Sequence, residues 1–171
     1  MKGIIVIDPK KCLACRTCEL QCAIAHSESK DLAKAICEDP LPQTRVKVEG
    51  MDDLAMPLQC RHCEDAPCVK ICPTEATIKS EDGGPVLIKD KLCIGCKWCV
   101  LVCPFGVIRM ARGGAAVTKC DLCFERLEKG EAPACVAACP SKAMQFKSIE
   151  EVSKGKKREY LVKFKKEKEL I

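Results

Sequence analysis

The residues with the most distinctive chemistry in this chain of 171 residues are its 17 cysteines. One group has three cysteines separated by two residues each and a fourth three residues later, directly before a proline: Cys93, Cys96, Cys99 and Cys103. Three thiolates at this spacing surround one [4Fe-4S] cluster, and the fourth, before the proline, ligates a different cluster. One such group therefore predicts at least a second.

Three further groups repeat the arrangement with longer gaps in two of them: Cys12, Cys15, Cys18 and Cys22; Cys60, Cys63, Cys68 and Cys72; and Cys120, Cys123, Cys135 and Cys139. Proline follows the fourth cysteine in every group except the first, where Ala23 takes its place. The groups include every cysteine except Cys37, which is interpreted as a free thiol of the small, buried kind. The sequence thus predicts four [4Fe-4S] clusters with the grouped cysteines as metal ligands.

Structural zinc and disulfide bonds are the alternative uses of so many cysteines. Paired Cys-x2-Cys units are typical of zinc sites, but zinc does not explain a third cysteine at the same spacing and a fourth before proline. The last group, with eleven residues before Cys135, fits either metal when considered by itself. Disulfides are disfavoured by the odd cysteine count and by the absence of a signal segment at the start of the sequence. We expect a reducing, anaerobic cytoplasmic setting.

Charge and motif content exclude several other functions. The formal net charge is +5, but four oxidised clusters with their thiolates bring about −8, so the loaded protein carries about −3. No helix-turn-helix or aromatic RNA-binding motif accompanies the lysines, and no glycine-rich phosphate loop is present. The apolar runs are shorter than the ~20 residues of a membrane helix. Four cysteine ligands leave no open iron position, which favours electron transfer over catalysis.

The elements around the cysteines are short, and each group repeats one pattern of cysteine loop, short helix, fourth cysteine and strand. Alternating or β-branched runs and glycine turns predict the strands, and good helix formers after Cys18 predict a helix reaching Ser27. A second short helix is expected within 31–38, and the charged segment 149–171 is expected to be helical. The predicted strands are 4–7, 45–49, 77–79, 86–88, 107–110, 116–118 and 143–146, which makes the fold class α+β.

A few residues outside the cysteine groups have two interpretations. His26 and His62 could adjust a cluster, but the preferred interpretation is hydrogen-bonded histidines without a metal. Trp98, the single tryptophan, could line an electron path, although packing beside a cluster and shielding it from water is preferred. The basic run 154–158 is either a solvated face or a surface for an acidic partner.

The segment 59–74, which holds Cys60, Cys63, Cys68 and Cys72, closely resembles the second cysteine motif of four-cluster polyferredoxins. These are electron-transfer subunits of dimethyl sulfoxide reductase, formate dehydrogenase and hydrogenase complexes. The resemblance covers roughly 4–146, and the stretch 25–30 is most similar to the iron-sulfur protein associated with carbon monoxide dehydrogenase. The chain departs from the respiratory members by Ala23 and by lacking their C-terminal membrane anchor.

This resemblance implies which cysteines share a cluster and how the chain divides. Two bacterial-ferredoxin-like lobes related by pseudo-symmetry are expected: an outer lobe of 1–58 and 105–147 with an insertion at 25–49, and an inner lobe of 59–104, followed by the tail 148–171. The implied ligand sets are Cys12, Cys15, Cys18 with Cys139; Cys120, Cys123, Cys135 with Cys22; Cys60, Cys63, Cys68 with Cys103; and Cys93, Cys96, Cys99 with Cys72.

The function implied is a relay of single electrons through four clusters. Its donor is expected to be a catalytic redox subunit, carbon monoxide dehydrogenase first and formate dehydrogenase or hydrogenase second. A hydrogenase, flavoprotein or ferredoxin would accept the electrons. A freely diffusing carrier is the alternative. Four clusters are useful chiefly along a fixed path between docked partners, so the insertion 25–49 and the tail 148–171 are the expected docking surfaces.

Overall fold

The computed structural model describes residues 3–52, 54–80, 83–112, 114 and 116–168. Its helices and strands are short, apart from the last helix, and the longest strands have five residues. Their bounds are β1 (Ile4–Ile7), α1 (Thr17–Ala25), α2 (Leu32–Ala35), β2 (Lys47–Met51), β3 (Leu54–Leu58), α3 (Pro67–Lys70), β4 (Thr77–Lys79), β5 (Val86–Ile88), α4 (Trp98–Val102), β6 (Arg109–Met110), β7 (Val117–Thr118), α5 (Phe124–Glu128), α6 (Ala134–Ala137), β8 (Met144–Lys147) and α7 (Ile149–Lys168).

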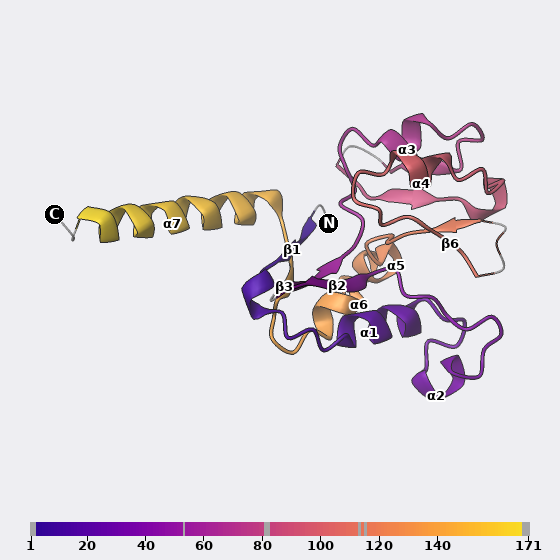
Figure 1. Cartoon of the computed structure of the whole chain (residues 1–171), viewed down its shortest axis with the longest axis horizontal. Coiled ribbons are helices and arrows are strands. Elements are labelled where there is room, and N and C mark those ends of the chain that lie inside the picture. Colours follow the sequence, from indigo (N-terminus) through magenta and orange to yellow (C-terminus); the bar gives the residue numbers. More distant parts are fainter. Residues whose placement is uncertain (1–2, 53, 81–82, 113, 115, 169–171) are drawn as a thin grey trace.

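The two ends of the cysteine-containing region lie side by side. Strand β1 pairs antiparallel with β8, with Ile5 opposite Phe146, and α1 packs near α6 (Figure 1). The backbone N–H of Asp8 extends this pairing by donating to the carbonyl of Ala143 at 2.8 Å. The first and last cysteine groups are therefore neighbours, although almost a hundred residues separate them.

The remaining strands form three antiparallel hairpins, β2–β3, β4–β5 and β6–β7. Helices α3 and α4 pack together beside the last two of these, in the upper right part of Figure 1. Ile108, directly before β6, and Val117, in β7, are buried in one cluster with Cys99. This hairpin thus packs with cysteines of the second and third groups.

Cysteines make up much of the small hydrophobic core. A larger cluster of buried residues combines Ile5, Val46 and Met144 with four cysteines, and the smaller cluster contains only Cys99, Ile108 and Val117 among its buried members. A chain with 4% aromatic residues has few side chains large enough to fill such an interior. Groups bound by the cysteines are therefore expected to contribute to the stability of the fold.

In the second, third and fourth cysteine groups, the chain leaves the helix in the same way at the last cysteine of the group. A proline follows each of them, and the third residue after the cysteine has a left-handed backbone: Glu75 (φ 52°), Gly106 (φ 59°) and Lys142 (φ 55°). Proline cannot continue a helix, so the chain turns back towards a strand. After Cys22 the helix former Ala23 stands instead, and α1 continues to Ala25.

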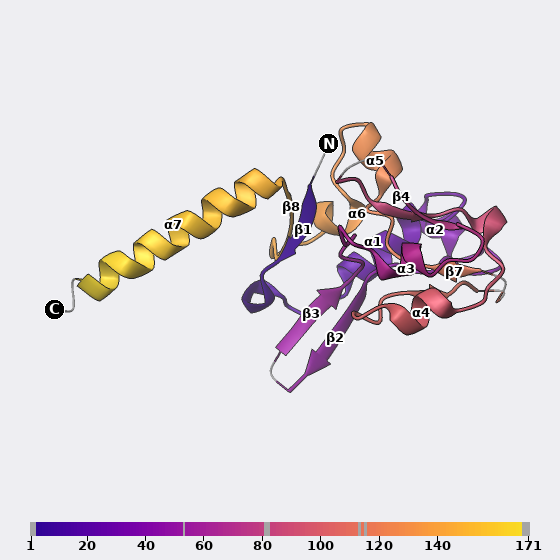
Figure 2. The ribbon, with the colours of Figure 1, turned by 90° about the horizontal axis from the view of Figure 1, so that it is seen from above.

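The last helix, α7, projects away from the rest of the molecule as an arm of about 30 Å (Figures 1 and 2). Ser148 and Glu151 form a capping box at its start: the Glu151 carboxylate accepts from the Ser148 N–H at 2.7 Å, and the Ser148 hydroxyl from the Glu151 N–H at 3.1 Å. Tyr160 and Leu161 are each about two-thirds exposed. The ring of Tyr160 stacks with that of Phe164, with 6.3 Å between the centroids.

Most of the predicted elements are confirmed, with differences at their ends. The hairpin strands Thr77–Lys79 and Val86–Ile88 agree residue for residue, although part of the predicted turn between them lies outside the described residues, as does Gly113 in the second turn. The helix after Cys18 ends two residues before the predicted Ser27, whose hydroxyl donates to the Ile24 carbonyl at 2.7 Å. The predicted tail helix reaches Lys168, and its last predicted residues, 169–171, also lie outside the described part.

The hairpin β2–β3 is where the prediction is wrong. The strand expected at 45–49 begins two residues later and continues to Met51, and β3 was not predicted at all. Strand β3 contains Pro57, which normally argues against a strand but is tolerated at a sheet edge. Pro57 lies opposite Val48 in a sheet of two described strands. Its missing N–H therefore costs no hydrogen bond to a further strand. Among the described helices, none has the length and apolar character required to cross a bilayer.

Candidate iron-sulfur sites

Three small cavities are each lined by four cysteines from separate parts of the chain. In each case the four are one of the sets implied by the sequence resemblance. The sets are Cys12, Cys15, Cys18 and Cys139; Cys60, Cys63, Cys68 and Cys103; and Cys72, Cys93, Cys96 and Cys99. Identical donor sets of four thiols indicate the same bound group at all three.

The fourth predicted set, Cys22 with Cys120, Cys123 and Cys135, is buried throughout. Burial raises the pKa of the three latter thiols, to about 11 for Cys123, and the nearby Cys22 thiolate raises each of them further. Cys22 belongs to the same buried cluster as Cys135, although more than a hundred residues separate the two. Its Sγ lies 3.7 Å from His26 Nδ1, and His26 offers a ligand atom within 4.8 Å of that of Cys123. The structure thus brings all sixteen predicted ligands together in fours.

The loops present backbone N–H groups and hydroxyls to the sulfurs. Cys60 Sγ accepts from the N–H of His62 at 3.4 Å, and Cys120 Sγ accepts from the N–H of Leu122 at 3.3 Å. Both donor residues have left-handed backbones, which turn the N–H groups towards the centre of the loop. The Thr17 hydroxyl donates to Cys15 Sγ at 3.4 Å. Such donors stabilise the negative charge of thiolate ligands.

In two of the groups, a residue with a hydroxyl group lies two positions after the fourth cysteine. The hydroxyls of Thr74 and Ser141 each lie 3.8 Å from the Sγ of Cys72 and Cys139, two residues before them. Burial by itself would raise the pKa of both thiols, but backbone N–H groups and these hydroxyls hold it below its ordinary value. These two cysteines are therefore suited to bind metal as thiolates.

The sets differ strongly in exposure. Cys15 and Cys96 are exposed, and each has a large exposed apolar neighbour, Leu13 (69%) and Ile94 (67%) respectively. All members of the set with Cys120 are buried instead. Two sites thus lie at the surface and one lies in the interior.

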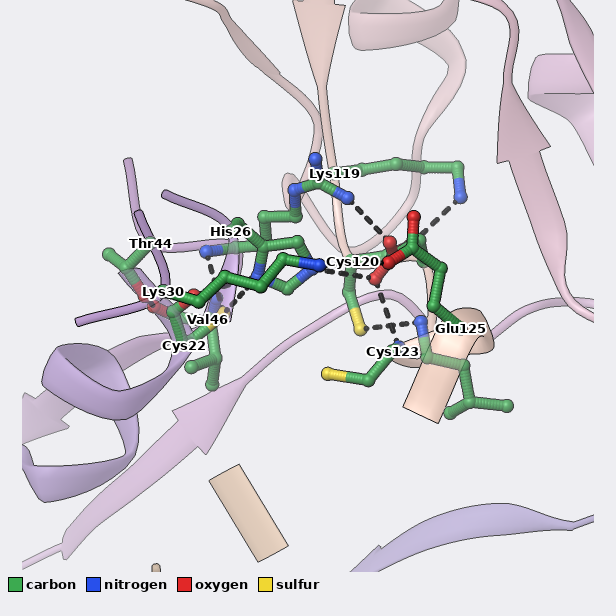
Figure 3. Close-up of polar contacts among 12 residues, drawn as sticks. Cys22, His26, Lys30, Thr44, Val46, Lys119, Cys120, Cys123 and Glu125 are labelled. Atoms are coloured by element: carbon green, nitrogen blue, oxygen red, sulfur yellow. Dashed lines mark hydrogen bonds and ion pairs between the residues drawn. The ribbon is translucent and has the colours of Figure 1, made fainter. Parts of the chain in front are cut away.

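A charged network that the sequence did not predict borders the interior site. His26 Nε2 lies 3.0 Å from Asp121 Oδ1, and Arg45 donates to Asp121 Oδ2 at 2.7 Å. Burial alone would lower the pKa of His26, but the hydrogen bond to Asp121 raises it to about 9, so the ring is an imidazolium at neutral pH. Figure 3 shows His26 beside Cys22: its Nδ1 lies 2.7 Å from the Cys22 carbonyl and 3.7 Å from the Sγ.

This network also explains why His26 is not an independent metal ligand. His26, Asp121 and Cys123 offer ligand atoms within 4.8 Å of one another, but the first two are already bound to each other and Cys123 belongs to a predicted cluster set. The backbone N–H of Arg45 donates to Cys22 Sγ at 3.2 Å, so the insertion contacts this site directly. The hydrogen-bonded interpretation of His26 fits the structure. Asp121 follows directly after Cys120, but nothing in the sequence marked Arg45 as its partner.

His62 is partly buried and neutral. The N–H of Val86 donates to its Nδ1 at 3.0 Å, and burial, reinforced by the positive charge of Lys119, lowers its pKa to about 3. Two other interpretations need correction. Trp98 is 52% exposed and does not line the cavity of its neighbouring cysteines, so it shields them less than predicted. Cys37 is exposed, not buried, with its Sγ 3.8 Å from the Ala33 carbonyl.

Comparison with known proteins agrees with this geometry. The 4Fe-4S dicluster domain family matches residues 51–149. An iron-sulfur protein of Rhodospirillum rubrum is 45% identical over 86% of this chain and 83% of its own length. The electron transport protein HydN of Escherichia coli is 39% identical over 96% of this chain and all of its own. One of the polypeptides of the anaerobic dimethyl sulfoxide reductase of that organism is 34% identical over 86% of this chain and 74% of its own length.

The chain therefore belongs to the 4Fe-4S dicluster domain family and is an iron-sulfur electron-transport protein. Its donor atoms fit the cofactor, because three cavities present four thiols each and a fourth set of four thiols lies in the interior. With sixteen grouped thiols among its 17 cysteines, the chain binds four [4Fe-4S] clusters. Its fold is of the ferredoxin-like α+β class.

Proposed function

We propose that this chain is a cytoplasmic, non-catalytic subunit that relays single electrons between a catalytic redox subunit and a second redox protein. The clusters, when bound, supply one-electron transfer. The observation that carries the proposal is the arrangement of sixteen thiols in complete sets of four. A cluster with four thiolate ligands has no open iron position for a substrate.

The proposed ligand sets are the four implied by the resemblance, and their grouping in space supports them. We also propose two lobes, with a changed boundary. The β6–β7 hairpin, first assigned to the outer lobe, packs against Cys99, and Val117 lines the cavity that contains Cys72. The inner lobe is therefore proposed to extend to Thr118, with the outer lobe made of 1–58 and 119–147.

The surface sites are proposed as the two ends of the electron path. Cys15 and Cys96 are the exposed members of their sets, and Leu13 and Ile94 provide apolar contacts beside them. A protein partner can approach such a site closely and exclude water from it. The buried set with Cys120 suits a position inside the path, because no partner reaches it directly.

The proposed catalytic partner is carbon monoxide dehydrogenase, on the resemblance around 25–30, with a formate dehydrogenase or hydrogenase as the alternative. The relatives include a polypeptide of a dimethyl sulfoxide reductase, which supports a redox enzyme as the class of partner. Docking is proposed to involve the insertion 25–49 and helix α7. Over its described side chains α7 carries an excess of Lys and Arg, which suits an acidic surface on the partner.

The experiment is a transfer assay under anaerobic conditions. The oxidised protein is mixed with a catalytic amount of each candidate enzyme and its substrate, and cluster reduction is followed by the loss of visible absorbance. Rapid reduction by one enzyme, together with co-purification from native cells, identifies the partner. Reduction by none of the enzymes would contradict the relay, whereas reduction without a stable complex would favour the freely diffusing carrier.

A further inference from the structure

Lys119 is the one charged residue in the buried class among the residues that the structure describes, with 3% of its surface exposed. It directly precedes Cys120, at the end of the hairpin β6–β7. A buried ammonium group is costly unless an opposite charge or several acceptors compensate for the lost hydration. Its surroundings therefore have to explain why a lysine is tolerated here.

The Lys119 ammonium is held by two backbone carbonyls. Its Nζ donates to the Val86 carbonyl. It also donates, at 3.0 Å, to the carbonyl of Cys120, which lies beside it in Figure 3. No carboxylate forms an ion pair with it in the described part of the chain. Asp121, two residues away, is bound to Arg45 and His26 instead. Hydrogen bonds thus compensate for some of the lost hydration, but no protein anion neutralises the charge.

The two carbonyls belong to the walls of two different cysteine sites. Val86 lines the cavity that contains Cys60, Cys63, Cys68 and Cys103, and Cys120 is a member of the interior set. The ammonium therefore lies between the two sites.

We propose that Lys119 is an internal counter-cation for the two clusters held by these sets and that it raises the reduction potentials of both. The inference rests on the ligand sets put forward under the proposed function. An iron-sulfur cluster with four thiolates is an anion and gains another negative charge on reduction, so a nearby cation stabilises the reduced form. In a site from which water is excluded, this interaction is only weakly screened.

The test compares three variants by anaerobic redox titration monitored by electron paramagnetic resonance. In K119Q and K119M the reduction equilibria of the two adjoining clusters should fall about tenfold, which is about 59 mV for one electron. K119R keeps the charge and should stay within threefold of the unmodified protein. The matched control is K97Q, because Lys97 adjoins the ligand Cys96 but is exposed, and water should screen its charge.

Iron and sulfide contents, measured first, make each outcome decisive. Full cluster content in K119Q with unchanged potentials would overturn the proposal. Loss of clusters in K119Q and K119M but not in K119R supports it, because only the charge distinguishes them. Equal loss in all three variants means that the lysine serves packing, and this also overturns it. Fewer than four clusters in the unmodified protein contradicts the ligand sets instead, so the two failures can be told apart.

Discussion

The interior site and the surface sites have the same four thiol donors in opposite surroundings. Around Cys120 and Cys135, burial raises the thiol pKa, and the His26–Asp121–Arg45 network borders the site. At the surface, Cys96 is exposed and Ile94 beside it projects into solvent. The difference teaches that the cysteine spacing specifies the cofactor, whereas burial and neighbouring charges differentiate the clusters.

Removal of iron should have the largest effect, because cysteines form much of the core. We expect an iron chelator under reducing conditions to unfold the body that surrounds the cysteines. Helix α7, which projects away from that body, contributes little to this cooperativity. Far-ultraviolet circular dichroism and hydrogen exchange measure the loss. Retention of exchange protection in β1 and β8 after complete iron removal would show that the polypeptide packing suffices.

Single ligand replacements should separate the interior from the surface. In C135S a buried ligand is replaced within the packed helix α6. We expect loss of the interior cluster, about four of about sixteen iron atoms, and loss of the packing of α6 against α1. In C96S the exposed position can be completed by the serine oxygen or water, and the fold should survive. Iron content and thermal unfolding of both proteins are compared. Equal losses would contradict the distinction between the sites.

Replacement of Cys72 tests whether ligands cross between groups. Cys72 lies in the cavity with Cys93, Cys96 and Cys99, so C72S should change the spectroscopic signature of that cluster. C103S is the matched control and should change the cluster of Cys60, Cys63 and Cys68 instead. Electron paramagnetic resonance of the reduced proteins distinguishes the two. The reverse assignment in either variant would disprove the exchange of ligands.

The charged network of His26, Asp121 and Arg45 should contribute less to the stability of the fold than the clusters and their ligands do. D121N leaves the Arg45 guanidinium partly buried without its anion and removes the carboxylate that keeps the His26 ring protonated. We expect a destabilisation of about 2 kcal/mol. This lowers the Tm by about 4–8 °C for a chain of this length. Removing the exposed pair of Lys30 and Glu125 by K30Q is the control and should change the Tm by under about 2 °C. Equal Tm shifts in the two variants would show that the network stabilises the fold no more than an exposed ion pair does.

Removal of the arm should affect the clusters least. Deletion of 148–171 should leave the iron content and the cluster spectra unchanged while weakening binding to the catalytic partner, since α7 projects away from the cysteines (Figure 2). Co-purification and calorimetry measure the binding. A variant with Lys154, Lys156 and Lys157 changed to Gln isolates the contribution of charge. If binding survives both this deletion and scrambling of 31–49, the proposed docking surfaces are wrong.

The cysteine spacing determined the cofactor and the number of clusters, and local residue patterns determined most of the short elements. Ligation by three nearby thiolates is a local property, and so are the proline after Cys72 and the glycine turns, so these features can be predicted from neighbouring residues. The paired strands at 77–79 and 86–88 were predictable for the same reason. Only the tertiary structure decided which sites are buried, where Pro57 is tolerated, and that Arg45 meets Asp121. It also placed Lys119 against Val86, because such contacts join residues that are remote in sequence and depend on the packing of the whole chain.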